Sequence, residues 1–191
     1  PRLYPGHTQL YLNTLTRWFP SPLKECFLVA SAREATALAL GMAKAYSHST
    51  GLLTVLGGPC CPDKAEPDSS SQSSSHTRCI VPHKMQMGSL QAQLRTNAEK
   101  LALSPFGLSA LIVECMITSE CLNYPSGFLE EAFDIVRSLK GLCIVDESQT
   151  GLGRSGFHFW YFQKLNIMPD IVIVGEALGN GFPLAAVITT K

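Results

Sequence analysis

The sequence predicts an α/β fold in which helices flank a mostly parallel sheet. Short, continuous apolar runs, typical of strands buried on both faces, alternate with longer segments whose apolar residues recur at helical spacing. Such alternation is typical of strands that are joined by helices. The strands expected from these runs cover residues 52–56, 108–113, 142–145, 171–174 and 185–189.

Three helices are expected, one before the first of these strands and two between later ones. Ser31-Ala32-Arg33-Glu34 reads as a capping box, in which the Ser31 hydroxyl accepts from the third amide of the helix and Glu34 reaches back. A helix over residues 32–47 follows. The predicted apolar face of this helix consists of Ala35, Leu38, Ala39, Met42, Ala45 and Tyr46. A second helix is predicted from Leu90, Leu94, Ala98 and Leu101, and a third from Phe128, Leu129, Ala132, Phe133, Val136 and Leu139.

The composition indicates a soluble globular protein. The 191 residues are 46% hydrophobic and 16% charged, and the formal net charge is zero. This balance argues against electrostatic binding to nucleic acid or a membrane, and no apolar run approaches the roughly 20 residues that span a bilayer. Seven cysteines without a C-x-x-C pair favour free thiols in a reducing compartment over a metal site. We therefore expect no nucleic-acid partner, no membrane and no metal.

One domain with a polar insertion accounts for the chain. Residues 62–78 are rich in serine and nearly devoid of apolar residues, so they cannot bury enough surface to offset their ordering entropy. We expect a disordered insertion there, because strand and helix patterns resume on both sides. We interpret residues 1–191 as one partial domain, since the chain begins at Pro1 and ends directly after an apolar run.

Acidic residues follow three of the expected strands. Glu114, Asp146 and Glu176 each stand at the carboxyl end of a strand or just beyond it. In parallel α/β sheets, ligands bind outside the carboxyl ends of the strands. These three positions are therefore candidate site residues, with solvated strand ends as the alternative interpretation.

The sequence contains partial matches to two nucleotide-binding motifs. The apolar run ending in Asp146-Glu147 resembles a Walker-B strand, but the G-x-x-x-x-G-K-[ST] loop that an ATPase needs is missing. Residues 151–156 read G-x-G-x-x-G, yet they do not follow their strand directly, as a dinucleotide fingerprint would. We interpret these glycines as loop formers.

Several linked motifs resemble those of the class-III aminotransferases. The segment D-E-S-Q-T-G-L-G-R-S-G at residues 146–156 is similar to the D-E-V-Q-T-G-F-G-R-x-G signature of that family. Pro169-Asp170-Ile171-Val172, the run G-N-G-F-P-L-A-A-V at residues 179–187 and Y-P-S-G-F-L at residues 124–129 also fit. Together with His158-Phe159-Trp160, they most resemble the mitochondrial alanine–glyoxylate aminotransferase 2 type.

The resemblance implies an incomplete large domain of a fold-type-I pyridoxal-phosphate (PLP) enzyme. In the family an aspartate holds the pyridine nitrogen of the cofactor, and Asp146 stands at that position. Gln149 matches a glutamine that hydrogen-bonds the phenolic oxygen of the ring. Glu114 matches a glutamate of the substrate pocket, although the proline that usually follows it is Cys115 here.

The largest departure from the family lies at the catalytic lysine. That lysine forms a Schiff base with the cofactor and later moves a proton. The flanking motifs align its position with Glu176, and a carboxylate cannot form an imine. Lys191 lies beyond the next strand and is no obvious substitute. The resemblance therefore implies PLP bound non-covalently at best, and loss of ordinary transamination.

A second departure concerns the phosphate of the cofactor. Where the family has S-G-S-E-A-N, this sequence has Ser31-Ala32-Arg33-Glu34-Ala35-Thr36 at a helix N-terminus, which is a natural anion site. Arg33 either pairs with a phosphate or Glu34, or is a solvated side chain on an altered turn.

The family assignment also implies partners and a compartment. Family members are homodimers that transfer amino groups between small amino and keto acids such as glyoxylate or pyruvate, and the type that the sequence most resembles is mitochondrial; otherwise a cytoplasmic location is expected. Leu3, Tyr4, Trp18 and Phe19 are either dimer contacts or core residues. The alternatives to a transaminase are a non-catalytic partner or regulatory subunit and a degraded gene product.

Overall fold

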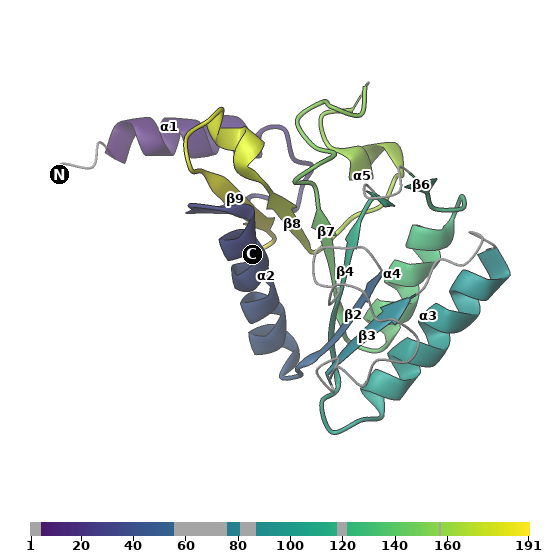
Figure 1. The fold of residues 1–191 in the computed structure, drawn as a ribbon. Helices are drawn as coiled ribbons and strands as arrows, with labels where there is room; N and C mark the ends of the chain where they lie inside the picture. Colours follow the sequence, from purple (N-terminus) through teal and green to yellow (C-terminus); the bar gives the residue numbers. More distant parts are fainter. Residues whose placement is uncertain (1–4, 56–75, 81–86, 118–121, 157) are drawn as a thin grey trace.

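The computed structural model describes residues 5–55, 76–80, 87–117, 122–156 and 158–191. Its centre is a seven-stranded sheet in the order β1-β9-β8-β7-β4-β2-β3 (Figure 1). The strands are β1 (Glu25–Val29), β2 (Gly51–Val55), β3 (Thr77–Ile80), β4 (Leu108–Glu114), β7 (Leu142–Asp146), β8 (Ile171–Val174) and β9 (Ala185–Thr189), and a separate two-stranded sheet pairs β5 (Met116–Ile117) with β6 (Leu122–Asn123).

The helices cover both faces of the sheet. Helix α2 packs on one face, mainly against β8 and β9, whereas α3 and α4 pack side by side on the other (Figure 1). The helices are α1 (Pro5–Thr16), α2 (Ala32–Ser47), α3 (Met87–Ala102), α4 (Phe128–Ser138), α5 (Tyr161–Lys164) and the 3₁₀ turn η2 (Glu176–Gly179). None of the helices in these described segments has the length and apolar character needed to cross a bilayer.

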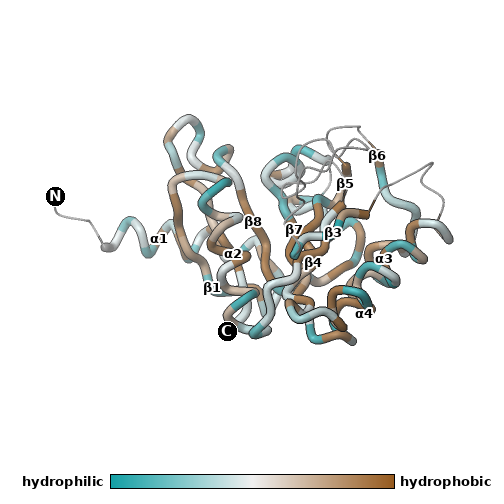
Figure 2. Tube along the Cα trace, turned by 60° about the horizontal axis from the view of Figure 1, so that its bottom comes forward, coloured by the Kyte–Doolittle hydropathy of each residue, from teal (hydrophilic) through white to brown (hydrophobic). Residues whose placement is uncertain are grey.

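The expected mostly parallel sheet is confirmed. Strands β3, β2, β4, β7 and β8 pair in parallel, and β9 and β1 continue the sheet in antiparallel fashion. Alternate residues of β4 enter different cores: Ala110 and Ile112 pack towards α2, whereas Leu111 and Val113 pack towards α3 and α4. Burial on both faces explains why the strands are continuous apolar runs, which Figure 2 shows as brown segments of the trace.

The expected helices form, but the face predicted for α2 is partly wrong. Helix α3 buries Leu90, Leu94, Ala98 and Leu101, as predicted. Helix α2 has the predicted bounds, but it buries the alanine ridge Ala35, Ala39 and Ala43, and Tyr46 is 73% exposed. Small side chains let the helix approach the sheet closely, so the larger residues flank the contact.

The predicted insertion extends too far at its carboxyl end. Thr77 and Arg78 belong to β3, which pairs in parallel with Leu52–Val55 of β2. This pairing gives the backbone groups of the short segment their hydrogen-bond partners, although the local sequence does not predict a strand there. Residues 62–75 lie outside the described residues, as do Leu3 and Tyr4.

Candidate functional site

The three strand-end acids lie at the same edge of the sheet. Glu114 at the end of β4 is the register partner of Asp146 at the end of β7, and Asp146 pairs in turn with Ile173 of β8. Glu176 follows Ile173 by three residues and begins η2. The parallel pairing therefore gathers these carboxylates where ligands bind in such sheets.

A cleft of about 450 Å³ opens beside these acids. Five residues line it together: Ala32, Arg33, Asp146 and Gln149, which were expected to bind a cofactor, and Glu114, which was expected in a substrate pocket. The sequence interpretation missed four further lining residues, which are Thr36, Ala37, Leu40 and Ser148. The first three lie one and two turns beyond Ala32 and Arg33, so the helical period was the signal that could have found them.

Asp146 is the most buried acid of the cleft. The residue is only 6% exposed, and the Ser148 amide donates a hydrogen bond of 2.8 Å to its Oδ1. Burial raises the pKa of Asp146, the hydrogen bond from Ser148 opposes that rise, and the nearby Glu114 and Glu176 add to it. A cation facing Asp146 would favour its ionised form.

Ser31 and Glu34 cap helix α2 instead of lining the cleft. The Ser31 hydroxyl accepts from the Glu34 amide at 3.2 Å, as the predicted capping box requires. Glu34 reaches back to the Ala30 amide at 2.9 Å, one residue before the N-cap. The Ser31 hydroxyl thus provides an acceptor in the first turn, where the amides lack helical partners, and Glu34 binds the residue that precedes the cap.

Glu176 reaches the same helix end from the segment that follows β8. Its Oε1 accepts a hydrogen bond of 2.7 Å from the amide of Ala32, the first residue of α2. This bond lowers the pKa of the exposed Glu176 carboxyl. The carboxylate therefore stands beside the cleft as an anion, at the position that the motifs align with the family's lysine.

A close approach of two backbones places Glu176. Gly175 follows β8 and packs against Ser148, where a Cβ atom would lie 2.8 Å from the Ser148 Cβ. Glycine allows the segment after β8 to approach the loop after β7 at this distance. Lys191 lies at the opposite edge, because β9 is antiparallel to β8 and pairs Thr189 with Ile171.

The loop after β7 holds Gln149 in the cleft. Arg154 donates from Nε to the Gly151 carbonyl at 2.8 Å and from a guanidinium nitrogen to the Ser148 carbonyl at 2.6 Å. Gly153 and Gly156 adopt positive φ angles of 77° and 110° in the turns that follow. The glycines are therefore loop formers, as interpreted from the sequence.

A buried acid supports the loop from behind. Glu147 is fully buried and accepts from the Phe162 amide at 2.8 Å and from the Thr150 hydroxyl at 2.6 Å. Burial raises the pKa of Glu147 to about 7, although these two hydrogen bonds act in the opposite direction. The carboxyl thus ties β7 to the start of α5 and does not face the cleft.

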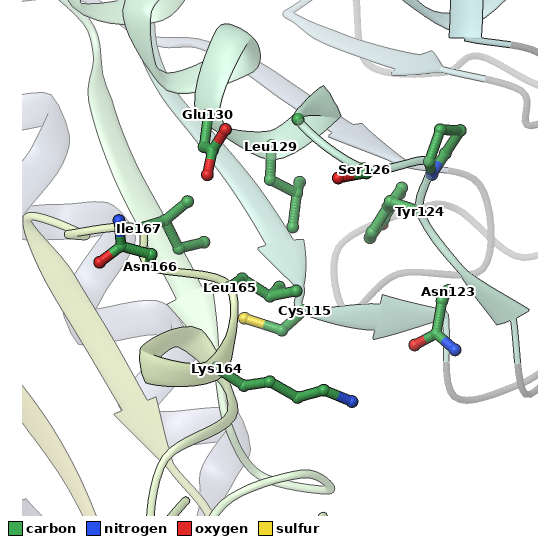
Figure 3. Close-up of a pocket in the computed structure, with 12 residues that line it drawn as sticks. Cys115, Asn123, Tyr124, Ser126, Leu129, Glu130, Lys164, Leu165, Asn166 and Ile167 are labelled. Carbon is green, nitrogen blue, oxygen red and sulfur yellow. The ribbon is translucent and has the colours of Figure 1, made fainter.

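A second cavity of about 290 Å³ lies by the carboxyl end of β4, and none of the site residues predicted from sequence lines it (Figure 3). Cys115, Tyr124 and Leu165 are among its lining residues, and Lys164 is directed to the Tyr161 ring at 4.9 Å. Burial raises the pKa of the Cys115 thiol well above its ordinary value, so this thiol is a poor nucleophile.

The described cysteines and possible metal ligands are dispersed over the fold. Cys26, Cys79, Cys115 and Cys143 are free thiols. Within the described segments, no three His, Cys, Asp or Glu side chains are grouped so that they could hold a metal ion.

The comparisons with known proteins agree with the fold and the motifs. The family model of class-III aminotransferases matches residues 69–191. Alanine–glyoxylate aminotransferase 2, mitochondrial, of Homo sapiens is 33% identical and spans 94% of this chain, and an alanine–glyoxylate aminotransferase 2-like protein of Drosophila melanogaster is 33% identical over 93%. A phospholyase from Arthrobacter, solved with phosphoethanolamine, superposes with a TM-score of 0.86 at 26% identity, covering 97% of this chain.

The chain spans less than half of each of these proteins. The alignments cover 42% of the human protein, 41% of the Drosophila protein and 48% of the Arthrobacter chain. The matched family and the transaminases of this fold are PLP-dependent.

Proposed function

The chain belongs to the class-III aminotransferase family, and from this premise we propose that it forms a PLP-type domain that holds the cofactor without a covalent bond and does not transaminate. The observation that carries the proposal is the Glu176 carboxylate beside the Asp146 cleft, at the position that the sequence motifs align with the family's lysine. PLP, when bound, supplies an electron sink for reactions at an amino-bearing carbon.

The cleft residues fit the ring of the cofactor. The buried Asp146 carboxylate would hold the proton on the pyridine nitrogen, and that cation would in turn keep Asp146 ionised. Gln149 lines the same cleft and carries amide donors for the phenolic oxygen. These two side chains would orient the ring, and Glu114 would meet the substrate side of the cleft.

The same cleft does not fit covalent attachment. Its lining residues include no lysine, and Glu176 offers an oxygen acceptor where an amine is needed. Lys191 follows the antiparallel strand β9 to the opposite edge of the sheet. Among the described residues, the lining of the cleft therefore lacks the group that would hold the aldehyde carbon and move the proton.

The wider role follows from the relatives. The names of the two relatives support small amino and keto acids, such as alanine and glyoxylate, as the ligand class, and the human protein's name supports a mitochondrial location. We propose a homodimer, as in the resembled family. The missing amine also favours a second role, that of a non-catalytic partner or regulatory subunit.

The test restores an amine at the proposed position. The Glu176→Lys variant, incubated with PLP, is expected to gain a visible absorption band and a lysine adduct at position 176 that borohydride traps. The wild-type chain and the Glu176→Gln variant, which has no amine, are expected to show neither. Absence of both signals in Glu176→Lys would contradict the ring site, and amino-group turnover by the wild-type chain would contradict the loss of transamination.

A further inference from the structure

The N-terminus of α2 opens on the cleft, yet an acid from a distant segment already occupies it. Ala32 and Arg33 of the first turn line the cleft. The Ala32 amide donates to Glu176, which lies 144 residues further along the chain, at 2.7 Å. A free helix N-terminus attracts anions, because its amides lack acceptors and the helix dipole is positive there.

Two further donors of this turn are also engaged. The Glu34 amide donates to the Ser31 hydroxyl at 3.2 Å, and the Ala35 amide donates to the Ser31 carbonyl at 2.9 Å. With Ala32, three of the four amides at residues 32–35 therefore have acceptors within the protein. An incoming phosphate would have to displace Glu176 in order to bind Ala32.

Charge around the cleft opposes an added anion as well. Glu114 and Asp146 line the cleft and Glu176 lies beside it, whereas Arg33 is the cation among the lining residues. The hydrogen bond from Ala32 keeps Glu176 ionised at neutral pH, since it lowers the pKa of that carboxyl. Like charges at such short range disfavour a phosphate dianion, and the solvent-exposed Arg33 offsets only part of this repulsion.

We propose that Glu176 is a specificity-determining residue that takes the place of a ligand phosphate at the N-terminus of α2, so that PLP is held mainly by its ring and its phosphate adds little to its affinity. The Glu176 carboxylate supplies the negative charge that the helix end would otherwise draw from a ligand. The inference rests on the proposed function, because it takes the Asp146 cleft to be the ligand site.

The experiment compares pyridoxal with pyridoxal phosphate on three proteins. Equilibrium dialysis gives the affinity of each ligand for the wild-type chain, Glu176→Ala and Glu34→Ala. The two variants are matched, since each removes one carboxylate that accepts a backbone amide at the same helix end. We expect Glu176→Ala to raise the preference for the phosphorylated ligand by about tenfold or more, and Glu34→Ala to leave it near the wild-type value.

Inorganic phosphate provides a second readout that does not depend on the pyridine ring. It should raise the melting temperature of Glu176→Ala and leave that of the wild-type chain unchanged. Failure of both pyridoxal and pyridoxal phosphate to bind any of the proteins would contradict the proposed function, whereas stabilisation of Glu176→Ala alone by phosphate would still support the inference. No gain by Glu176→Ala with either phosphate compound, or an equal gain by Glu34→Ala, would overturn it.

Discussion

At the scale of single residues, Glu147 shows how the molecule uses an acid that does not face the cleft. Its carboxyl accepts from the Phe162 amide and the Thr150 hydroxyl, and the Cys115 thiol lies 3.9 Å from it. These contacts join β7, the loop after it and the start of α5. Because burial outweighs the hydrogen bonds, the pKa of Glu147 rises to about 7.

The raised pKa of Glu147 predicts a pH-dependent stability. The folded chain holds this proton more tightly than the unfolded chain, whose glutamate titrates near 4.5. The contribution of Glu147 to stability is therefore greatest below that ordinary pKa, and it falls by roughly 1–3 kcal/mol as pH rises from about 4.5 to about 7. Urea denaturation at several pH values should show this decline in the wild-type chain.

The control for this prediction is Glu147→Gln, which keeps an acceptor for the Phe162 amide but cannot ionise. Asp146 also has a raised pKa and contributes in the same direction, so the difference between wild type and variant isolates Glu147. An equally steep decline in the variant would assign the pH dependence to other groups.

At the scale of elements, α2 connects the sheet to the site. Its alanine ridge brings the helix close to β8 and β9, and its first turn presents Ala32 and Arg33 to the cleft. Ser31 fixes where the helix begins, in an extended conformation with φ of −155°. Stability of this helix and geometry of the site are therefore linked.

Two substitutions in α2 should change stability in opposite directions. Ser31→Ala removes the acceptor for the Glu34 amide and is expected to cost about 1 kcal/mol. Gly41→Ala is expected to stabilise the helix by roughly 0.5–1 kcal/mol, because an added Cβ meets no atom within 4 Å and the unfolded chain loses freedom. Thermal and urea denaturation measure both effects, and a destabilised Gly41→Ala would contradict the open surface at that position.

At the scale of the whole molecule, aromatic side chains join the N-terminal segment to the α5 region. Phe19 stacks on Trp160 and Trp18 stacks on Phe159, each with ring centroids 4.4 Å apart. The indole nitrogen of Trp160 donates to the Trp18 carbonyl at 3.1 Å, across 142 residues of sequence. Phe19 is thus a core residue, whereas Trp18 remains 52% exposed.

This junction predicts unequal costs for its two tryptophans. Trp160 is fully buried, and Trp160→Ala is expected to cost about 3–5 kcal/mol, which is a large share of the stability of a domain. Trp18→Ala removes a half-exposed ring and should cost about 1 kcal/mol, since the Trp18 carbonyl remains available to Trp160. Urea denaturation followed by circular dichroism compares the two, and equal costs would contradict the assigned packing.

Much of the site could be predicted because each strand and the acid after it are encoded by neighbouring residues in the sequence. Glu114, Asp146 and Glu176 each follow an apolar run, and parallel pairing necessarily places such ends at one edge. Strands β1 and β3 were not predicted, because their short sequences lack a clear period and they gain partners only from β9 and β2.

The sequence alone determined the alternation of strands and helices, the acids at the strand ends and the absence of an amine at position 176, since each depends on residues near one another in the chain. Only the tertiary structure decided which face of α2 meets the sheet and which amide Glu176 accepts from. The reason is physical: a hydrogen bond across 144 residues depends on how closely two elements pack, and packing is a property of the whole assembled core.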